Sequence, residues 1–387
     1  MTLLLILIYI AFIALGIPDS LFGSSWPAIY TELGLNISVG GAISMLCSLC
    51  MIVSSLNASK LIKKFGTFKL TIMCTLLTAL ALIGYSISKN IYMLILFTIP
   101  LGLGAGSVDS ALNNYVALRY SPRVMNFLHC SYGIGVSVSP IIMSSVLDKT
   151  NNWHVGYLLM GIVQAIIALL LLLTIPLSKK IEEKYQDSTE VNVIGLKEGL
   201  KIKGVIFSIL IFMISCSIET TVGGWISTYL VNSKDVLVKD AAGYAGIYFI
   251  GFTLGRLISS IIVKKLGSKN MIFIGEGITL VATILLIINV SLTITLIGVF
   301  FIGFGIGPIY PNMTHLTPKM YSKENSQSII GFQMAAASLG IMTIPFLYGI
   351  LADVISPNIF PIYVFVLNII LAISIIALYK IKKERMN

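Results

Sequence analysis

Residues 3–28 read LLLILIYIAFIALGIPDSLFGSSWPA, an apolar run with a single carboxylate, Asp19. About 20 consecutive apolar residues are enough for a helix to cross the hydrocarbon core of a bilayer. The whole chain of 387 residues has the same character, because 57% of it is hydrophobic, 11% is charged and its mean hydropathy is +0.95. This composition predicts a polytopic membrane protein and excludes a soluble protein with one anchor.

Twelve such runs follow one another along the chain. They predict an all-α membrane protein with twelve transmembrane helices, and the even number places both termini on one side of the membrane. The predicted spans are Leu4–Ile29, Ile37–Leu56, Leu70–Ile87, Ile91–Ala117, Phe127–Val146, Val155–Leu177, Val205–Leu230, Ala241–Val263, Met271–Ile288, Leu292–Leu316, Ile329–Leu351 and Phe360–Leu378.

Lysine and arginine gather in every second break between the spans and in the C-terminal tail. The break 57–69 holds four lysines, and the break 178–203 holds six. Because basic residues favour cytoplasmic loops, both termini are expected in the cytoplasm. The net charge of +10 is therefore interpreted as this asymmetry and not as a surface that binds nucleic acid.

Short motifs recur at an almost constant interval and indicate a duplicated unit of six helices. Lys63–Gly66, KKFG, recurs 201 residues later as Lys264–Gly267, KKLG, and Gly102–Gly106 recurs at the same interval as Gly303–Gly307. Two parallel repeats of six helices are typical of the major facilitator superfamily. The expected domains are an N-terminal bundle, a cytoplasmic linker, and a C-terminal bundle with a short tail, at residues 1–177, 178–203 and 204–387.

Asp19 and Glu219 occupy equivalent places in the first helix of each repeat, 200 residues apart. A charge at bilayer depth costs at least about 2.5 to 3.5 kcal/mol, so such residues face the bundle interior or water. We predict that the two acids face each other near the midplane and bind the coupling ion or the substrate. Gly16, Pro18 and Gly223–Gly224 are expected to let these helices bend or unwind. The alternative is that each acid is a neutral, hydrogen-bonded residue that holds its half together.

Other polar and aromatic side chains within the spans are candidates for the wall of a substrate cavity. A polar helix face begins at Asp109, and Tyr310 is its counterpart in the second repeat. A structural network of hydrogen bonds between helices is the alternative interpretation. The two tryptophans that follow the acids either stack on a sugar ring or anchor the helices at the membrane interface. The candidate cavity residues are Asp109, Asn113, Asn114, Trp26, Trp225, Tyr310, Asn312 and Gln333.

Four further titratable residues are interpreted as parts of a gate. Arg256 and Glu276 lie at matching depths on the two sides of one basic loop, which predicts an ion pair that is structural or gating. His129 and His315 are expected near the cytoplasmic ends of their helices, as polar residues of an inner gate that can titrate near neutral pH.

Three segments resemble one family of transporters. Ile218–Leu230, IETTVGGWISTYL, Asn126–Gly135, NFLHCSYGIG, and the glycine pattern Gly102–Gly106 are similar to those of the fucose:proton symporter group, in the branch of the glucose/mannose:proton symporters. The resemblance extends over nearly the whole chain. It implies the twelve-helix fold, and it places Asp19 and Glu219 at the positions of acids that such symporters use for proton coupling or sugar contact.

Two departures from the superfamily's motifs bear on function. Ser59–Phe68, SKLIKKFGTF, keeps the basic and glycine elements of the loop motif but lacks its aspartate, which puts a charge relay at the inner gate in doubt. The fifth span has Gly135 and Pro140 without the adjacent Gly-Pro of drug antiporters, which counts against multidrug efflux.

We therefore expect a secondary active transporter that moves a small polar solute, in the first place a sugar, by symport with a proton or a sodium ion. Proton-coupled efflux of drugs or metabolites is the alternative within transport, and a non-transporting membrane sensor is the alternative outside it. An enzyme is not expected, because no nucleophile with a base and no cluster of metal ligands accompanies the acids. No cofactor, metal or nucleic acid is expected. The implied partners are the solute and the lipid bilayer of the cell membrane, and a monomer is expected by analogy.

Overall fold

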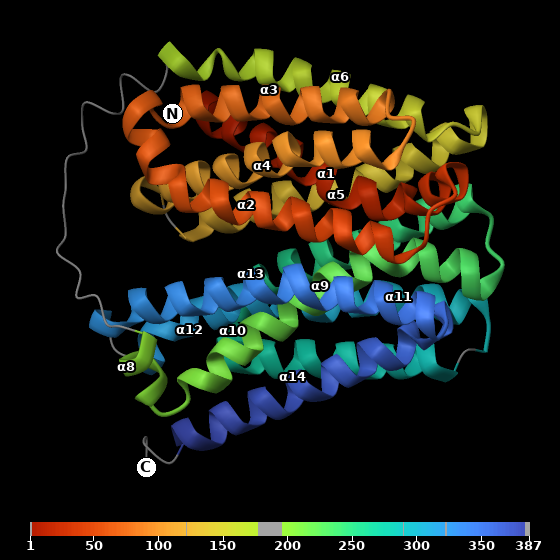
Figure 1. The fold of residues 1–387 in the computed structure, drawn as a ribbon. Helices are drawn as coiled ribbons and strands as arrows, with labels where there is room; N and C mark the ends of the chain where they lie inside the picture. Colours follow the sequence, from red (N-terminus) through yellow and green to blue (C-terminus); the bar gives the residue numbers. More distant parts are fainter. Residues whose placement is uncertain (1, 121, 177–195, 289, 322, 384–387) are drawn as a thin grey trace. The chain divides into compact units, whose positions relative to one another are not determined.

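The structure is a computed structural model that describes residues 2–120, 122–176, 196–288, 290–321 and 323–383. Every regular element in these ranges is a helix, as predicted (Figure 1). The elements are α1 Thr2–Leu33, α2 Ser38–Phe65, α3 Thr67–Ser86, α4 Ile91–Arg119, α5 Pro122–Thr150, α6 Trp153–Leu171, α8 Leu196–Lys201, α9 Val205–Lys234, α10 Val238–Ile288, α11 Leu292–Ile306, α12 Ile309–Tyr321, α13 Lys323–Val354, the 3-10 turn η1 Pro357–Ile359, and α14 Phe360–Lys383.

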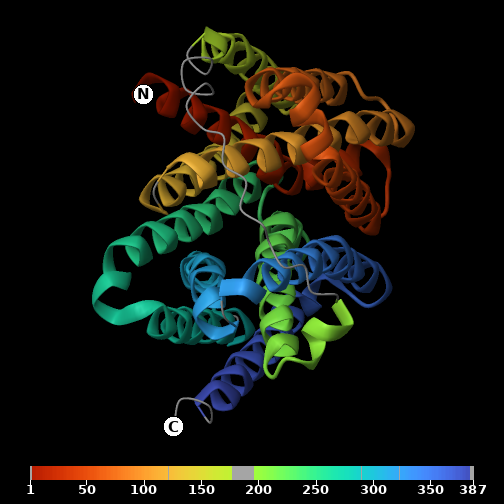
Figure 2. The ribbon, with the colours of Figure 1, turned by 90° about the vertical axis from the view of Figure 1, so that its left-hand side faces the viewer.

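The helices account for the twelve predicted spans. Eleven helical segments within the described ranges are long and apolar enough to cross a membrane. One of them, α10, is two spans in one, because Gly267 interrupts its helical backbone with φ 77° and ψ 152°. Figure 2 shows α10, in teal, folding back on itself as two arms. The tenth predicted span corresponds to α11 and α12 together, over Leu292–Thr317.

The chain folds into two compact units. Unit 1 consists of residues 1–187 and Gly224–Gly246, and unit 2 of residues 188–223 and 247–387. The expected linker, 178–203, contains one boundary between the units and lies largely outside the described residues. The units differ from the expected bundles in the segment Gly224–Gly246, the end of α9 and the start of α10, which groups with unit 1.

Side-chain contacts explain why Gly224–Gly246 groups with unit 1. The Tyr30 hydroxyl, near the end of α1, donates a hydrogen bond of 3.2 Å to Asn232 Oδ1. The Lys239 ammonium, at the start of α10, lies 2.5 Å from the Asp148 carboxylate at the end of α5. Within the rest of unit 1, α1 packs on α5, α2 and α3 pack on α4, and α3 packs on α6 (Figure 1).

The duplication seen in the sequence is reproduced by the packing inside each unit. In unit 1, a Cβ atom on Gly102 would lie 2.4 Å from the Cys47 carbonyl oxygen, and in unit 2 a Cβ atom on Gly303 would lie 2.2 Å from the Tyr248 carbonyl oxygen. Cys47 and Tyr248 are 201 residues apart, like the two glycines. Two further pairs of contacts match at the same interval. Gly104 approaches the carbonyl oxygen of Cys74 as Gly305 approaches that of Gly275. Gly106 approaches the carbonyl oxygen of Met51 as Gly307 approaches that of Phe252.

The repeated loop motif also has the same backbone in both units. Gly66 has φ 78° and ψ 156°, and Gly267 has φ 77° and ψ 152°. Side chains other than glycine rarely adopt a positive φ with extended ψ, so KKFG and KKLG both end at the one residue type that makes this turn without strain.

We expect Gly303→Ala to destabilise the protein by about 1 to 3 kcal/mol, because the added methyl group overlaps the backbone of α10. Gly277→Ala is the matched control, since a Cβ atom at Gly277, also within a membrane helix, meets nothing within 4 Å. Thermal unfolding of the purified protein in detergent measures both. Equal unfolding midpoints for the two variants would contradict the close helix packing.

Candidate functional site

The acid of unit 1, Asp19, is exposed in a stretch of α1 whose neighbouring residues are buried. The Tyr132 hydroxyl, from α5, donates a hydrogen bond of 2.8 Å to Asp19 Oδ2. This contact is possible because α1 and α5 approach closely at Gly16, where a Cβ atom would lie 2.4 Å from the Tyr132 carbonyl oxygen. Asp19 is thus an exposed carboxylate that a side chain from a neighbouring helix holds in place.

The acid of unit 2, Glu219, lies in α9 beside a cation. Arg256 Nη2, from α10, is 3.6 Å from Glu219 Oε2, and the two side chains are only 12% and 23% exposed. The Tyr248 hydroxyl donates a hydrogen bond of 3.2 Å to the Glu219 carbonyl oxygen, which ties α10 to α9 at the same level. A charge pair this far removed from water is screened little and responds strongly when either partner loses its charge.

Two further contacts orient the Arg256 guanidinium. Its Nε–H donates to the Gly307 carbonyl oxygen at 3.4 Å, and its central carbon lies 3.9 Å from the centre of the Phe252 ring. A guanidinium over an aromatic face is attracted by the ring quadrupole. Phe252 is four residues before Arg256 on α10, so one helix presents both groups on the same face.

The expected ion pair between Arg256 and Glu276 is not formed. Glu276 is 5% exposed, and neither of its carboxylate oxygens has a hydrogen-bond partner among the described residues. The prediction used matching depths on the two arms of α10, and it was wrong because depth does not fix the direction of a side chain around its helix. Arg256 is directed to Gly307 and Glu219 instead.

The helices around the two acids are continuous. α1 runs from Thr2 to Leu33 through Pro18, and α9 runs from Val205 to Lys234 through Gly223–Gly224. The expected unwinding at these residues is therefore absent from the structure.

The polar face of α4 contains an internal hydrogen bond. Asn113 Nδ2 donates to Asp109 Oδ1 at 2.8 Å, one turn away. Asn114 lies in the same helix, but its side chain is outside the part that the structure describes. Asp109 and Asn113 are both half-buried, so either interpretation made from the sequence fits their placement.

The two tryptophans are buried inside the protein. Trp26 is 1% exposed, its ring fills the space beside Gly40, and its Nε1–H donates to the Ile37 carbonyl oxygen at 3.1 Å. Trp225 is also buried. Neither ring presents a face to a solute in this structure, so Trp26 holds the end of α1 against the start of α2.

Asn312 and Gln333 are also buried, and both join helices of unit 2. Asn312 Nδ2 donates to Ser259 Oγ at 2.9 Å. Gln333 Nε2 donates to Ser208 Oγ, and Gln333 Oε1 accepts from Thr317 Oγ1 at 3.2 Å. Their polar groups are occupied by neighbouring helices, which is the structural network named as the alternative for such residues.

The remaining candidates lie in separate surroundings. Tyr310 packs edge-on against Phe212, with ring centres 5.2 Å apart, and its hydroxyl is 3.1 Å from the Met334 sulfur. His129 contacts Phe12 edge-on at 6.0 Å in unit 1, whereas His315 is exposed in unit 2.

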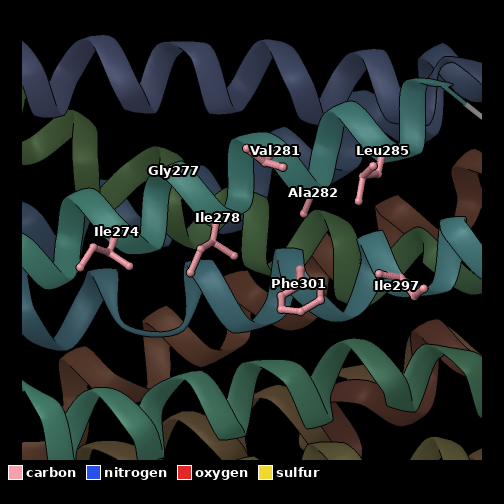
Figure 3. Close-up of a pocket in the computed structure, with 8 residues that line it drawn as sticks. All are labelled: Ile274, Gly277, Ile278, Val281, Ala282, Leu285, Ile297 and Phe301. Atoms are coloured by element: carbon pink, nitrogen blue, oxygen red, sulfur yellow. The ribbon is translucent and has the colours of Figure 1, made fainter.

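A pocket of about 500 Å³ in unit 2 contains none of the candidate residues (Figure 3). It lies between the second arm of α10 and α11, and its lining is one glycine and seven hydrophobic side chains. Ile274, Val281, Ile297 and Phe301 are exposed there, as expected for a groove that faces lipid. It offers no polar group to orient a polar solute, so we do not assign the site to it.

Three site residues were missed by sequence reasoning. Tyr248 and Phe252 lie 201 residues after Cys47 and Met51, which contact the first glycine triplet. Adding this interval to the positions of Cys47 and Met51 leads to Tyr248 and Phe252 in the second repeat. Tyr132 stands in the segment whose family resemblance was noted, but only the contact of α5 with α1 reveals its partner.

Comparison with known proteins agrees with the fold. The sequence profile of the Major Facilitator Superfamily matches residues 8–288 and 239–386. Bypass of stop codon protein 6 of Saccharomyces cerevisiae is 24% identical over 388 residues, covering 91% of this chain and 77% of the yeast protein. The glucose/mannose transporter GlcP of Bacillus subtilis is 23% identical over 305 residues, covering 76% of this chain and 74% of GlcP.

Solved structures share the same fold. A bacterial homologue of the human lysosomal transporter Spinster, in an inward-facing and unoccupied conformation, has a TM-score of 0.76 at 12% identity, covering 99% of this chain and 97% of that chain. At this level of identity the likeness concerns the fold alone.

Proposed function

This chain belongs to the Major Facilitator Superfamily and is a multi-pass membrane transporter, and we propose that it moves a small polar solute, in the first place a sugar, by symport with a cation. The observation that carries the proposal is the pair of intramembrane acids at equivalent places in the two repeats, each contacted by a side chain from a neighbouring helix. The relationship to a glucose/mannose transporter supports a sugar as the first solute to test.

The contacts of Glu219 suggest how the cation is coupled to the solute. The negative charge of the Glu219 carboxylate balances the positive charge of Arg256. A proton or a sodium ion that binds to the carboxylate cancels this negative charge and leaves the charge of Arg256 unbalanced. Solute binding then becomes favourable only in the cation-loaded state, and the loaded transporter changes the side to which its site opens. We propose the proton as the coupling ion, with both termini in the cytoplasm and the protein in the plasma membrane.

Uptake into proteoliposomes tests this function. With labelled hexoses outside and an inward proton gradient, we expect solute accumulation above its external concentration, and we expect a protonophore to abolish it. A sodium gradient alone is expected to give equilibration without accumulation. Absence of gradient-driven uptake of any polar solute, with drug efflux from cells that express the protein, would reject symport in favour of the antiporter alternative.

A further inference from the structure

Most hydrogen-bond donors of Arg256 have no acceptor within the described part of the chain. A guanidinium has five N–H groups. In the structure the Nε–H donates to Gly307 at 3.4 Å, and Nη2 is 3.6 Å from Glu219, which is an ion-pair distance beyond a hydrogen bond. The other donors therefore have no hydrogen-bond acceptor among the residues that the structure describes. Because the side chain is 12% exposed, leaving these donors unsatisfied is costly unless a ligand or water accepts from them.

The donors of Arg256 that remain without an acceptor among the described residues are those of its terminal fork. Phe252 covers one face of the guanidinium, and Gly307 occupies the Nε–H. The two terminal nitrogens that remain form the arrangement that binds a carboxylate through two parallel hydrogen bonds. A single sugar hydroxyl does not match this fork in either charge or geometry.

Charge balance leads to the same class of ligand. When Glu219 takes up a proton, the positive charge of Arg256 loses the neighbour that balances it. Among the described residues, the other titratable groups that interact with the pair are the Cys216 thiol and the Tyr248 phenol, and Glu276 makes no hydrogen bond with it. A neutral sugar leaves the half-buried cation without a counter-charge, whereas an anionic solute that arrives with the proton restores neutrality.

We propose that Arg256 binds a carboxylate of the solute, and that the transported solute is therefore a sugar acid, a hexose-sized monoanion. This rests on the proposed symport and names the solute class of the same site. The solute anion and Glu219 alternate as partners of Arg256, so that one proton and one monoanion cross together and the transport cycle moves no net charge.

Two measurements on the full-length protein test this inference, with glucuronate and glucose as the probes. In detergent, thermal-shift titration is expected to give glucuronate a dissociation constant at least about tenfold lower than that of glucose. Arg256→Gln is expected to remove this preference, Arg256→Lys to retain part of it, and Lys265→Gln, which removes an exposed charge from the same helix, to leave it unchanged. The double variant Arg256→Gln/Glu219→Gln keeps the pair neutral and reports on folding.

In proteoliposomes on a solid-supported electrode, glucuronate uptake driven by a proton gradient is expected to give no steady current. Gradient-driven uptake of glucose that glucuronate does not inhibit, and that persists in Arg256→Lys, would overturn the inference and leave the proposed symport intact. Failure of every solute to accumulate would overturn the symport. Preferential binding of glucuronate in detergent, lost in Arg256→Gln, would still support the assignment of Arg256.

Discussion

Replacement of Glu219 by glutamine is expected to abolish gradient-driven accumulation of solute, so that the internal concentration only reaches the external one. Glutamine has nearly the shape of glutamate but takes up no proton in the physiological range, and it no longer neutralises Arg256 at 3.6 Å. Exchange of labelled for unlabelled solute across the membrane is expected to continue, because exchange does not need the proton to leave. The two assays together separate lost coupling from lost transport.

Glu276→Gln is the matched control for this variant. Glu276 is the same residue type in the same unit, it is more deeply buried than Glu219, and its oxygens make no hydrogen bond within the described residues. Replacing a buried, unpartnered carboxylic acid by an amide is expected to leave accumulation unchanged. Normal accumulation in Glu219→Gln, or an equal loss in both variants, would remove Glu219 from the coupling role.

The fold follows from the sequence to an unusual extent, because each span is fixed by its own length and polarity. The duplication adds a second source of information. Gly66 and Gly267 share a positive φ, and Gly102 and Gly303 contact carbonyl oxygens 201 residues apart. The interval that indicated a duplication in the sequence therefore recurs in a turn and in a packing contact. The membrane leaves few alternatives to a helix, so local pattern decides the element.

The site was predicted only in part, because partners depend on direction around a helix. The acids Asp19 and Glu219 stand out from sequence by their cost in a bilayer. The partner of Arg256 does not stand out from the sequence. Matching depth pointed to Glu276, whereas the guanidinium packs on Phe252 and pairs with Glu219. A polar residue within a span has the same sequence signal whether it faces a cavity or another helix.

That ambiguity explains the buried candidates. Trp26, Asn312 and Gln333 were all placed in the cavity wall on their residue type, and all three use their polar groups between helices. In an apolar solvent every such group needs a partner within the protein, so internal networks are as common a reason for polarity as a ligand. Exposure in the structure is what separates Asp19 from this set.

Asp19→Asn is expected to raise the half-saturation concentration for the solute at least about tenfold while accumulation at saturating solute is retained. The Asp19 carboxylate is exposed, so its oxygens can accept hydrogen bonds from solute hydroxyls, and the neutral amide accepts them more weakly. Tyr132→Phe is expected to raise the half-saturation concentration only a few-fold, since this variant removes one hydrogen bond, 2.8 Å long, that fixes the carboxylate.

Tyr157→Phe is the matched control for Tyr132→Phe. Tyr157 is buried, and its hydroxyl is 3.0 Å from Ser25 Oγ on α1, the helix that also contains Asp19. Initial uptake rates over a range of solute concentrations measure all three. Loss of accumulation in Asp19→Asn at saturating solute would transfer the coupling role to Asp19, and equal effects of Tyr132→Phe and Tyr157→Phe would show that Tyr132 acts on stability and not on the site.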